Sequence, residues 1–163
     1  MHRTMIRSDQ TLSDSEISEI LNRGTNGILA LSGADGYPYG VPMSYVYYNQ
    51  IIYFHCAKVG YKMELMETNP KVCFTVVDQD QIVGSEFTTY YRSVIAFGNI
   101  RMTGEKEKEE AFLAFCAKYA GDMPLAERQA KVAGCENALI IAIDIAQITG
   151  KQAVELMNRK PPE

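Results

Sequence analysis

The sequence IYFHCAKVGYK, at residues 52–62, combines three structural signals in one short stretch. An apolar run with the composition of a β-strand ends at His55, a loop follows, and apolar residues at helical spacing then continue to Pro70. A loop that leads into a helix N-terminus gathers backbone N–H groups and the positive end of the helix dipole, which suits an anion such as a phosphate. Lys58 and Lys62 add positive charge at the same place. The stretch therefore predicts a strand–loop–helix unit whose loop is either an anion site of a cofactor pocket or an ordinary strand–helix junction.

Length and composition predict one well-filled domain. The chain has 163 residues, 47% of them hydrophobic, and a formal net charge of −4. A chain of this length buries roughly 70% of its unfolded surface in a single core. We expect one domain over residues 1–158 and a disordered tail at 159–163. Because charges of both signs are interspersed, the sequence offers no electrostatic basis for binding nucleic acid.

The sequence also lacks signals for a membrane or for export. No apolar run approaches the roughly 20 residues of a membrane span, and the N-terminus has no apolar signal-peptide core. The cysteines show no paired metal-ligand spacing, so we expect reduced thiols, no metal site and a cytoplasmic protein. They are Cys56, Cys73, Cys116 and Cys135.

A short helix is predicted near the N-terminus. Ser13 and Glu16 have the spacing of a capping box, in which each side chain bonds the backbone N–H of the other residue. Leu12 and Ile17 have the positions of a hydrophobic staple, and Gly24 follows where the helix would end.

Strand signals dominate from about residue 28 to residue 102. An edge strand or a bulge is predicted over 37–48, because Pro38 and Pro42 cannot donate hydrogen bonds to a ladder. Asn49-Gln50 is a turn between this segment and the strand at 51–55. Further strands are predicted at 28–31, 72–77 and 87–102, with a polar loop at 78–86.

The remaining elements are helices inserted between strands and one late strand. Helices are predicted from Glu105 to about residue 120 and over about 124–132, followed by an apolar strand at 138–145. This order favours a mainly β fold, an antiparallel β-barrel with peripheral helices. A doubly wound nucleotide fold would require a Gly-rich first turn, and the sequence contains no such motif.

Several motifs, taken in order, resemble one protein family. They are PYGVPMSY at 38–45, IYFH at 52–55, GYK at 60–62, NP at 69–70 and YRSVIAFG at 91–98. This series is similar to the nitroimidazole-resistance (Nim) branch of the pyridoxamine 5′-phosphate oxidase-like flavoproteins, from about residue 3 to residue 151. The resemblance implies an FMN-binding split barrel with Greek-key antiparallel topology, and a homodimer with FMN in the groove between subunits.

The resemblance also implies a set of cofactor contacts. The strand at 41–45 would lie along the flavin ring, and the end of the strand at 54–55 would border the ring and ribityl chain. The loop lysine would contact the phosphate, and further contacts would come from 93–94 and 151. The implied cofactor-binding residues are Val41, Pro42, Met43, Ser44, Tyr45, Phe54, His55, Lys58, Gly60, Lys62, Ser93, Val94 and Lys151. A single GYK replaces the richer basic loop of the oxidase itself, so the resemblance points to the cofactor more than to oxidation of pyridoxamine phosphate.

Two interpretations of the key side chains stay open. His55 either satisfies a neighbouring carbonyl or lines the flavin site, where it would be the catalytic residue that donates a proton to a substrate being reduced. Lys62 is either solvated or bound to phosphate; the second is favoured because a cation is disfavoured near a helix N-terminus unless an anion is present.

Three functions remain under consideration. The leading hypothesis is an FMN-dependent oxidoreductase that reduces a small organic substrate such as a nitroaromatic 5-nitroimidazole. The alternatives are a non-catalytic module that holds FMN or haem on the same fold, and a structural dimer without a ligand.

Overall fold

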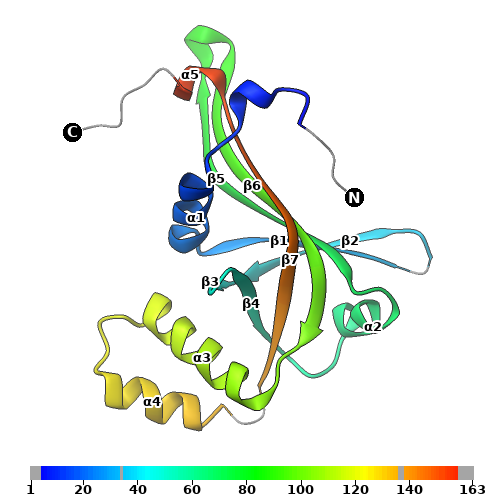
Figure 1. Cartoon of the computed structure of the whole chain (residues 1–163), viewed down its shortest axis with the longest axis vertical. Coiled ribbons are helices and arrows are strands. Elements are labelled where there is room, and N and C mark those ends of the chain that lie inside the picture. Colours follow the sequence, from blue (N-terminus) through cyan, green and yellow to red (C-terminus); the bar gives the residue numbers. More distant parts are fainter. Residues whose placement is uncertain (1–4, 34, 136–137, 158–163) are drawn as a thin grey trace.

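The computed structural model describes residues 5–33, 35–135 and 138–157 (Figure 1). The tail predicted to be disordered, residues 159–163, lies outside the described residues. The strands are β1 (Asn26–Ser32), β2 (Pro38–Ser44), β3 (Val46–Tyr48), β4 (Ile51–Cys56), β5 (Lys71–Val83), β6 (Thr88–Met102) and β7 (Leu139–Gln152). The α-helices are α1 (Asp14–Arg23), α2 (Tyr61–Thr68), α3 (Glu105–Tyr119), α4 (Leu125–Ala133) and α5 (Val154–Met157), with short 3₁₀ turns η1 (Ser8–Gln10) and η2 (Gly84–Glu86).

The seven strands form one antiparallel sheet in the order β2-β1-β5-β6-β7-β4-β3 (Figure 1). β2 and β4 are not neighbours in this order, yet they are in contact, which means that the sheet curls on itself. Helices α2, α3 and α4 are inserted between strands, α1 precedes the first strand and α5 follows the last, and the helices lie at the periphery in space (Figure 1). The predicted antiparallel split barrel with peripheral helices is confirmed.

Two apolar clusters hold the elements together. The larger, which we call the main cluster, fills the inside of the curled sheet. It includes Phe54, Phe74 and Ile141, each at most 1% exposed. α1 covers this cluster with the apolar face that its spacing predicted. The smaller cluster lies beneath α3, where Phe112 packs with Ile140.

Several local predictions are confirmed by hydrogen bonds and backbone angles. The Ser13 backbone N–H donates to the Glu16 carboxylate at 2.8 Å, and the Glu16 N–H donates to the Ser13 hydroxyl at 3.3 Å, which completes the capping box. β2, which carries both prolines, is an edge strand of the sheet. Asn49 and Gln50 both have positive φ, as the tight turn between β3 and β4 requires.

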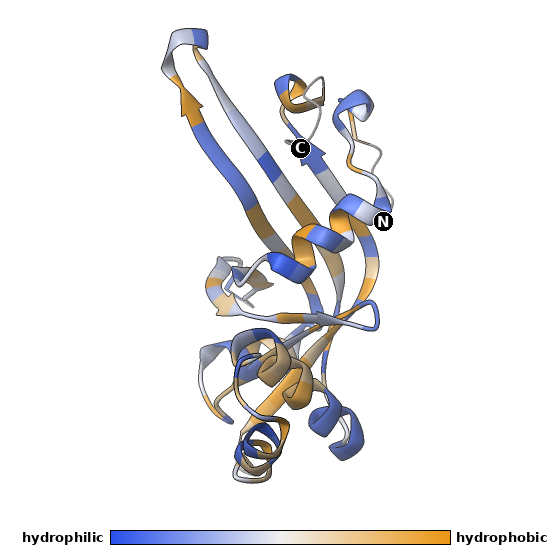
Figure 2. Cartoon of the chain, turned by 90° about the vertical axis from the view of Figure 1, so that its left-hand side faces the viewer, coloured by the Kyte–Doolittle hydropathy of each residue, from blue (hydrophilic) through white to orange (hydrophobic). Residues whose placement is uncertain are grey.

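The predicted polar loop at 78–86 is wrong. β5 continues to Val83 after a bulge beside Asp78, and only Gly84–Glu86 turns the chain back into β6. β7 likewise extends beyond the predicted end at 145, to Gln152, because β6 offers it a continuous partner. The β5–β6 hairpin therefore forms a long arm that extends beyond the barrel (Figure 2). Near its tip the Thr88 hydroxyl donates to the Glu155 carboxylate of α5 at 3.3 Å.

A polar network fastens α3 to the sheet on the outside. The Arg101 guanidinium bonds Asp144 at 2.7 Å and Glu107 at 2.7 Å, and the Tyr53 hydroxyl donates to Glu107 at 3.1 Å. The guanidinium holds the pKa of Glu107 below its usual value. Three strands and one helix are thereby joined by one arginine and two carboxylates.

Tyr53 predicts a loss of stability at alkaline pH. Burial, together with the bond to Glu107, raises the pKa of Tyr53 to about 12, whereas the phenol in an unfolded chain ionises near ~10. Above pH ~10 the unfolded chain has lost a proton that the folded chain still holds, so the free energy of unfolding falls as pH rises through this window. Urea unfolding across it should show a smaller fall in Tyr53→Phe than in the wild type. The exposed Tyr48 offers the control: Tyr48→Phe should keep the wild-type slope, and an equal slope in all three proteins would contradict the assignment.

Candidate functional site

The loop between β4 and α2 supplies a helix N-terminus that no side chain caps. Gly60 is the N-cap residue, with φ of +127°, a conformation that favours glycine. It is exposed, as is Lys58, and Lys62 in the first turn is half-buried. The first N–H groups of a helix have no partner within the helix. The loop thus presents unpaired donors and two lysines, as the sequence predicted.

His55 and its neighbours alternate between the two faces of β4. Phe54 and Cys56 point into the main cluster, and His55 is exposed on the face that also carries Tyr53. Burial raises the pKa of the Cys56 thiol. The opposite orientations keep this thiol away from the imidazole, so the two do not form a nucleophilic pair.

β2 offers an open strand edge. It pairs with β1 on one side and ends the sheet on the other. Val41 and Met43 pack against the main cluster, whereas Pro42 and Ser44 are exposed on the outer face. The free edge leaves main-chain groups of this segment available to a planar ligand.

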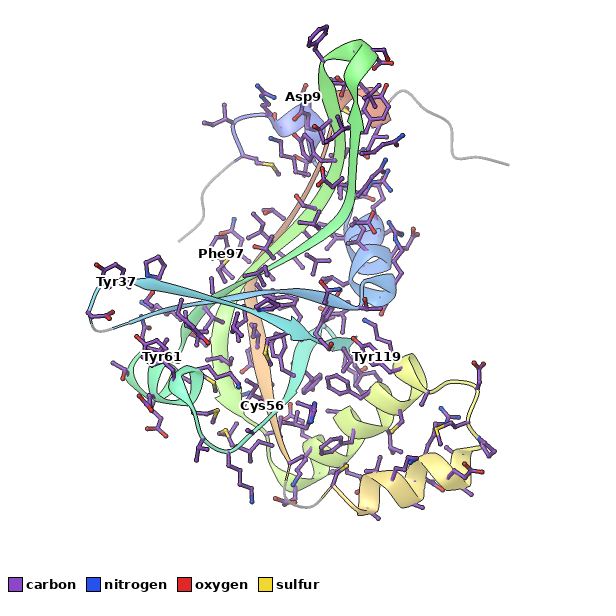
Figure 3. The ribbon with its side chains drawn as sticks, turned by 180° about the vertical axis from the view of Figure 1, so that it is seen from behind. Asp9, Tyr37, Cys56, Tyr61, Phe97 and Tyr119 are labelled. Atoms are coloured by element: carbon purple, nitrogen blue, oxygen red, sulfur yellow. The ribbon has the colours of Figure 1, made fainter. Side chains whose placement is uncertain are left out.

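A ring contact links the loop to this edge. The Tyr61 ring, at the start of α2, meets the Tyr39 ring of β2 edge-on, with centroids 5.1 Å apart. Tyr61 lies on the same side of the molecule as Tyr37 of the β1–β2 hairpin (Figure 3). The structure therefore brings the Gly60–Lys62 segment beside the edge strand, although the two are separated in sequence.

Three predicted residues are available only through their main chain. The side chains of Tyr45, Phe54 and Val94 are at most 1% exposed and belong to the main cluster. The main chain of Tyr45 is also engaged, because its N–H donates to the Tyr119 hydroxyl at 3.2 Å and its carbonyl accepts from the same hydroxyl at 2.8 Å.

Tyr119 and Lys118 form a polar corner that the sequence did not indicate. The Lys118 ammonium lies 4.2 Å from the centre of the Tyr45 ring and donates to the Leu21 carbonyl at 3.3 Å, at the C-terminal end of α1. Burial lowers the pKa of Lys118 to about 8. In the sequence Tyr119 continues the helical spacing of Phe112 and Phe115, which indicates only a helix. The corner exists because the folded chain brings the end of α3 to Leu21 and Tyr45.

Ser93 and Lys151 lie far from the loop within one chain. They oppose each other on β6 and β7, whereas His55 opposes Ile140 at the other end of β7. At about 3.3 Å per residue, Ile140 and Lys151 are roughly 36 Å apart along the strand. The Lys151 ammonium instead lies 5.4 Å from the centre of the Tyr91 ring.

Other kinds of site are not supported by the described residues. Within 5–33, 35–135 and 138–157, no three His, Cys, Asp or Glu side chains gather as a possible metal site. No helix of the described chain combines the length and hydrophobicity of a membrane crossing. A cavity of about 410 Å³ lies between α3 and α4, and none of its lining residues belongs to the predicted set. Its lining combines charged residues such as Glu105 and Lys106 with apolar residues such as Phe112 and Val132. The loop and the edge strand, which carry the predicted residues, remain the better candidate.

The curled antiparallel sheet, the edge strand β2 and the loop between β4 and α2 together define a split β-barrel protein. The sequence model of the pyridoxamine 5′-phosphate oxidase family matches residues 13–152, and the chain belongs to this family.

Solved structures share the fold at low sequence identity. A conserved protein of Mycobacterium tuberculosis superposes with a TM-score of 0.81 at 20% identity, covering 98% of this chain and 97% of that one. A protein assigned to 5-nitroimidazole antibiotic resistance in Bacteroides thetaiotaomicron gives 0.71 at 22% identity, covering 87% and 86%. An FAD-binding protein of Mesorhizobium loti gives 0.64 at 24% identity, covering 88% and 97%. No curated protein sequence matches significantly.

Proposed function

We propose that the chain is an FMN-binding flavoprotein that reduces a small organic compound, with nitroaromatic compounds as the substrate class. The observation that carries the proposal is the uncapped N-terminus of α2, with Gly60 and Lys62, held against the open edge of β2 by the contact between Tyr61 and Tyr39. A phosphate fits the first feature and a flat, polar heterocycle fits the second.

The chain's own residues have separable roles in this proposal. Lys62 and the first N–H groups of α2 hold the phosphate through charge-assisted hydrogen bonds. Main-chain groups between Val41 and Ser44 bond the polar edge of the ring and orient it. Bound FMN supplies the redox chemistry, which is the transfer of electrons from a nicotinamide or another reductant to the substrate.

His55 is the proposed proton donor. Its side chain is exposed on β4. Because it is in contact with water, it can recover a proton from the solvent after each turnover. An imidazole delivers protons efficiently near neutral pH, and nitro reduction consumes protons as well as electrons. In this proposal His55 is the one residue of the predicted set that acts as a proton donor.

Two relatives support the choice of cofactor and substrate class. One shares the fold and is assigned to 5-nitroimidazole resistance, and another shares the fold and binds FAD. FMN is preferred here because the proposed anion site is a single helix N-terminus with a single lysine in its first turn.

A spectroscopic titration tests the proposal. The full-length protein is titrated with FMN, FAD and riboflavin, and bound flavin is followed by its visible absorption and by fluorescence quenching. We expect FMN to bind best, to bleach with a reduced nicotinamide and to regain its colour on addition of a nitroimidazole. A protein that binds none of the three flavins would refute the proposal. Flavin that binds but is inert to every reductant would leave the binding module as the function.

The sheet's outer face supports a homodimer as part of the proposal. In antiparallel pairs, directly opposed residues point to the same side of the sheet, and so do residues two apart on one strand. By these two rules Ile28 of β1, Val77 of β5 and Phe97 of β6 share the outer face. They are 44%, 63% and 47% exposed. A second copy would cover these side chains, and it would also bring its own Ser93 and Lys151 to a loop that one chain keeps apart from them.

Phe97, which is labelled in Figure 3, is the residue that we expect at the centre of this interface. We expect Phe97→Arg to convert a wild-type dimer into a monomer, because an unpaired charge in an apolar interface costs several kcal/mol, and to weaken FMN binding at the same time. Light scattering gives the mass. Leu125→Arg, on an exposed position of α4, is the matched control and should remain dimeric. A wild-type monomer that binds FMN tightly would contradict the dimer.

A further inference from the structure

The Tyr119 hydroxyl occupies the point where β2 leaves β1. It accepts from the Tyr45 N–H at 3.2 Å and lies 2.5 Å from the Thr25 carbonyl oxygen and 2.8 Å from the Tyr45 carbonyl oxygen. Its single proton can be donated to one of these carbonyls at a time. One side-chain oxygen thus bridges the main chains of two neighbouring segments.

The strand register explains why this position matters. The last pair of the β1–β2 ladder is Asn26 with Ser44, so the next pair would be Thr25 with Tyr45. The Tyr119 oxygen lies between the N–H of Tyr45 and the carbonyl of Thr25, and it bonds both. The hydroxyl therefore takes the place of a ladder hydrogen bond at the point where the chain separates from β1 and enters β3.

Two neighbouring residues of α3 fix the position of the Tyr119 side chain. The Phe115 ring, one helical turn earlier on α3, stacks on the Tyr119 ring with an interplanar angle of 18° and centroids 5.9 Å apart. The neighbouring Lys118 anchors the same helix end to α1 and to the Tyr45 ring. Burial raises the pKa of Tyr119, so the hydroxyl stays protonated and able to donate.

We propose that Tyr119 is a positioning residue for the flavin-binding edge. By fixing the end of β2 at Tyr45, it sets the direction of the main-chain groups from Pro42 to Ser44. These groups are the ones that the proposed function assigns to the ring of the flavin, so this inference rests on that function. Tyr119 does not contact the ligand; it acts through the strand.

A comparison of FMN with riboflavin distinguishes this role from phosphate binding. Riboflavin lacks the phosphate, so a variant that disturbs only the ring contacts should weaken FMN and riboflavin by the same factor. We expect Tyr119→Phe to weaken both about tenfold, the size of one hydrogen bond's effect on the alignment of the edge. The reduction potential and the visible spectrum of the bound flavin should also shift, because the polar contacts of the ring change. Tyr48→Phe, at an exposed tyrosine, should bind both flavins as the wild type does.

Each outcome has one meaning. Unchanged affinity, potential and spectrum in Tyr119→Phe, with a wild type that binds flavin, would overturn the inference and leave the proposed function intact. A wild type that binds neither flavin would overturn the proposed function instead. Should Tyr119→Phe fail to fold, 3,5-difluorotyrosine at position 119 keeps the ring and the hydroxyl but ionises at lower pH. Flavin affinity should then fall over the pH range of that ionisation, and a profile that matches the wild type would overturn the inference.

Discussion

Lys62→Ala is expected to weaken FMN binding about 5- to 150-fold. A charge-assisted hydrogen bond to phosphate contributes about 1–3 kcal/mol, and Lys62 lies in the first turn of the uncapped helix α2. Fluorescence quenching of FMN by the purified protein gives the dissociation constant. The effect should shrink at high ionic strength, because part of the interaction is electrostatic and is screened by salt.

Riboflavin makes this prediction specific. Since it carries no phosphate, its affinity should be the same for Lys62→Ala and for the wild type. Lys131→Ala, which removes an exposed lysine on α4, controls for the change in net charge and should bind FMN normally. If Lys62→Ala bound FMN as tightly as a wild type that binds it well, the phosphate would have to be placed elsewhere.

Gly98→Val is expected to lower the free energy of unfolding by about 3 kcal/mol or more. Gly98 is buried at the bulge between β6 and β7. A Cβ added there would collide with the main-chain oxygen of Asp144 and lie 2.7 Å from a methyl carbon of Ile143. Because a backbone oxygen cannot move aside as a side chain does, the pairing of β6 with β7 would have to shift. Urea unfolding measures the loss.

Gly84→Ala is the matched control for this variant. Gly84 is exposed in the turn of the β5–β6 arm, and an added Cβ would have nothing within 4 Å. Its stability should equal that of the wild type or exceed it slightly, because alanine restricts the unfolded chain. If Gly98→Val were as stable as Gly84→Ala, the expected clash of a side chain at position 98 with β7 would be contradicted.

The sequence predicted the fold best where a local rule agrees with the tertiary structure. The capping box at Ser13, the edge strand with its two prolines and the tight turn at Asn49 depend on neighbouring residues alone. The polar composition of residues 78–86 predicts a loop, but the part up to Val83 is a strand. It is a strand because its backbone pairs with β6, a partner that the composition of the segment does not reveal.

The candidate site was predicted to a similar extent. The loop with Gly60 and Lys62 has a sequence signal, since glycine and lysine before a helix indicate an anion site. Tyr119 had none, because a tyrosine at helical spacing indicates packing. Its role depends on the meeting of α3 with the end of the β1–β2 ladder, which only the folded chain brings about.

The position of β7 between β6 and β4 has a consequence for synthesis on the ribosome. β4 emerges early, but its main partner is the last strand of the sheet to be made. Until then the nascent chain exposes Ile52 and Phe54, which are fully buried in the finished protein. Pairings between segments so distant in sequence are slow to form and leave apolar strands open to association in the meantime. The barrel can therefore close only after β7 has been translated, and until then the side of β4 that pairs with β7 has no partner strand.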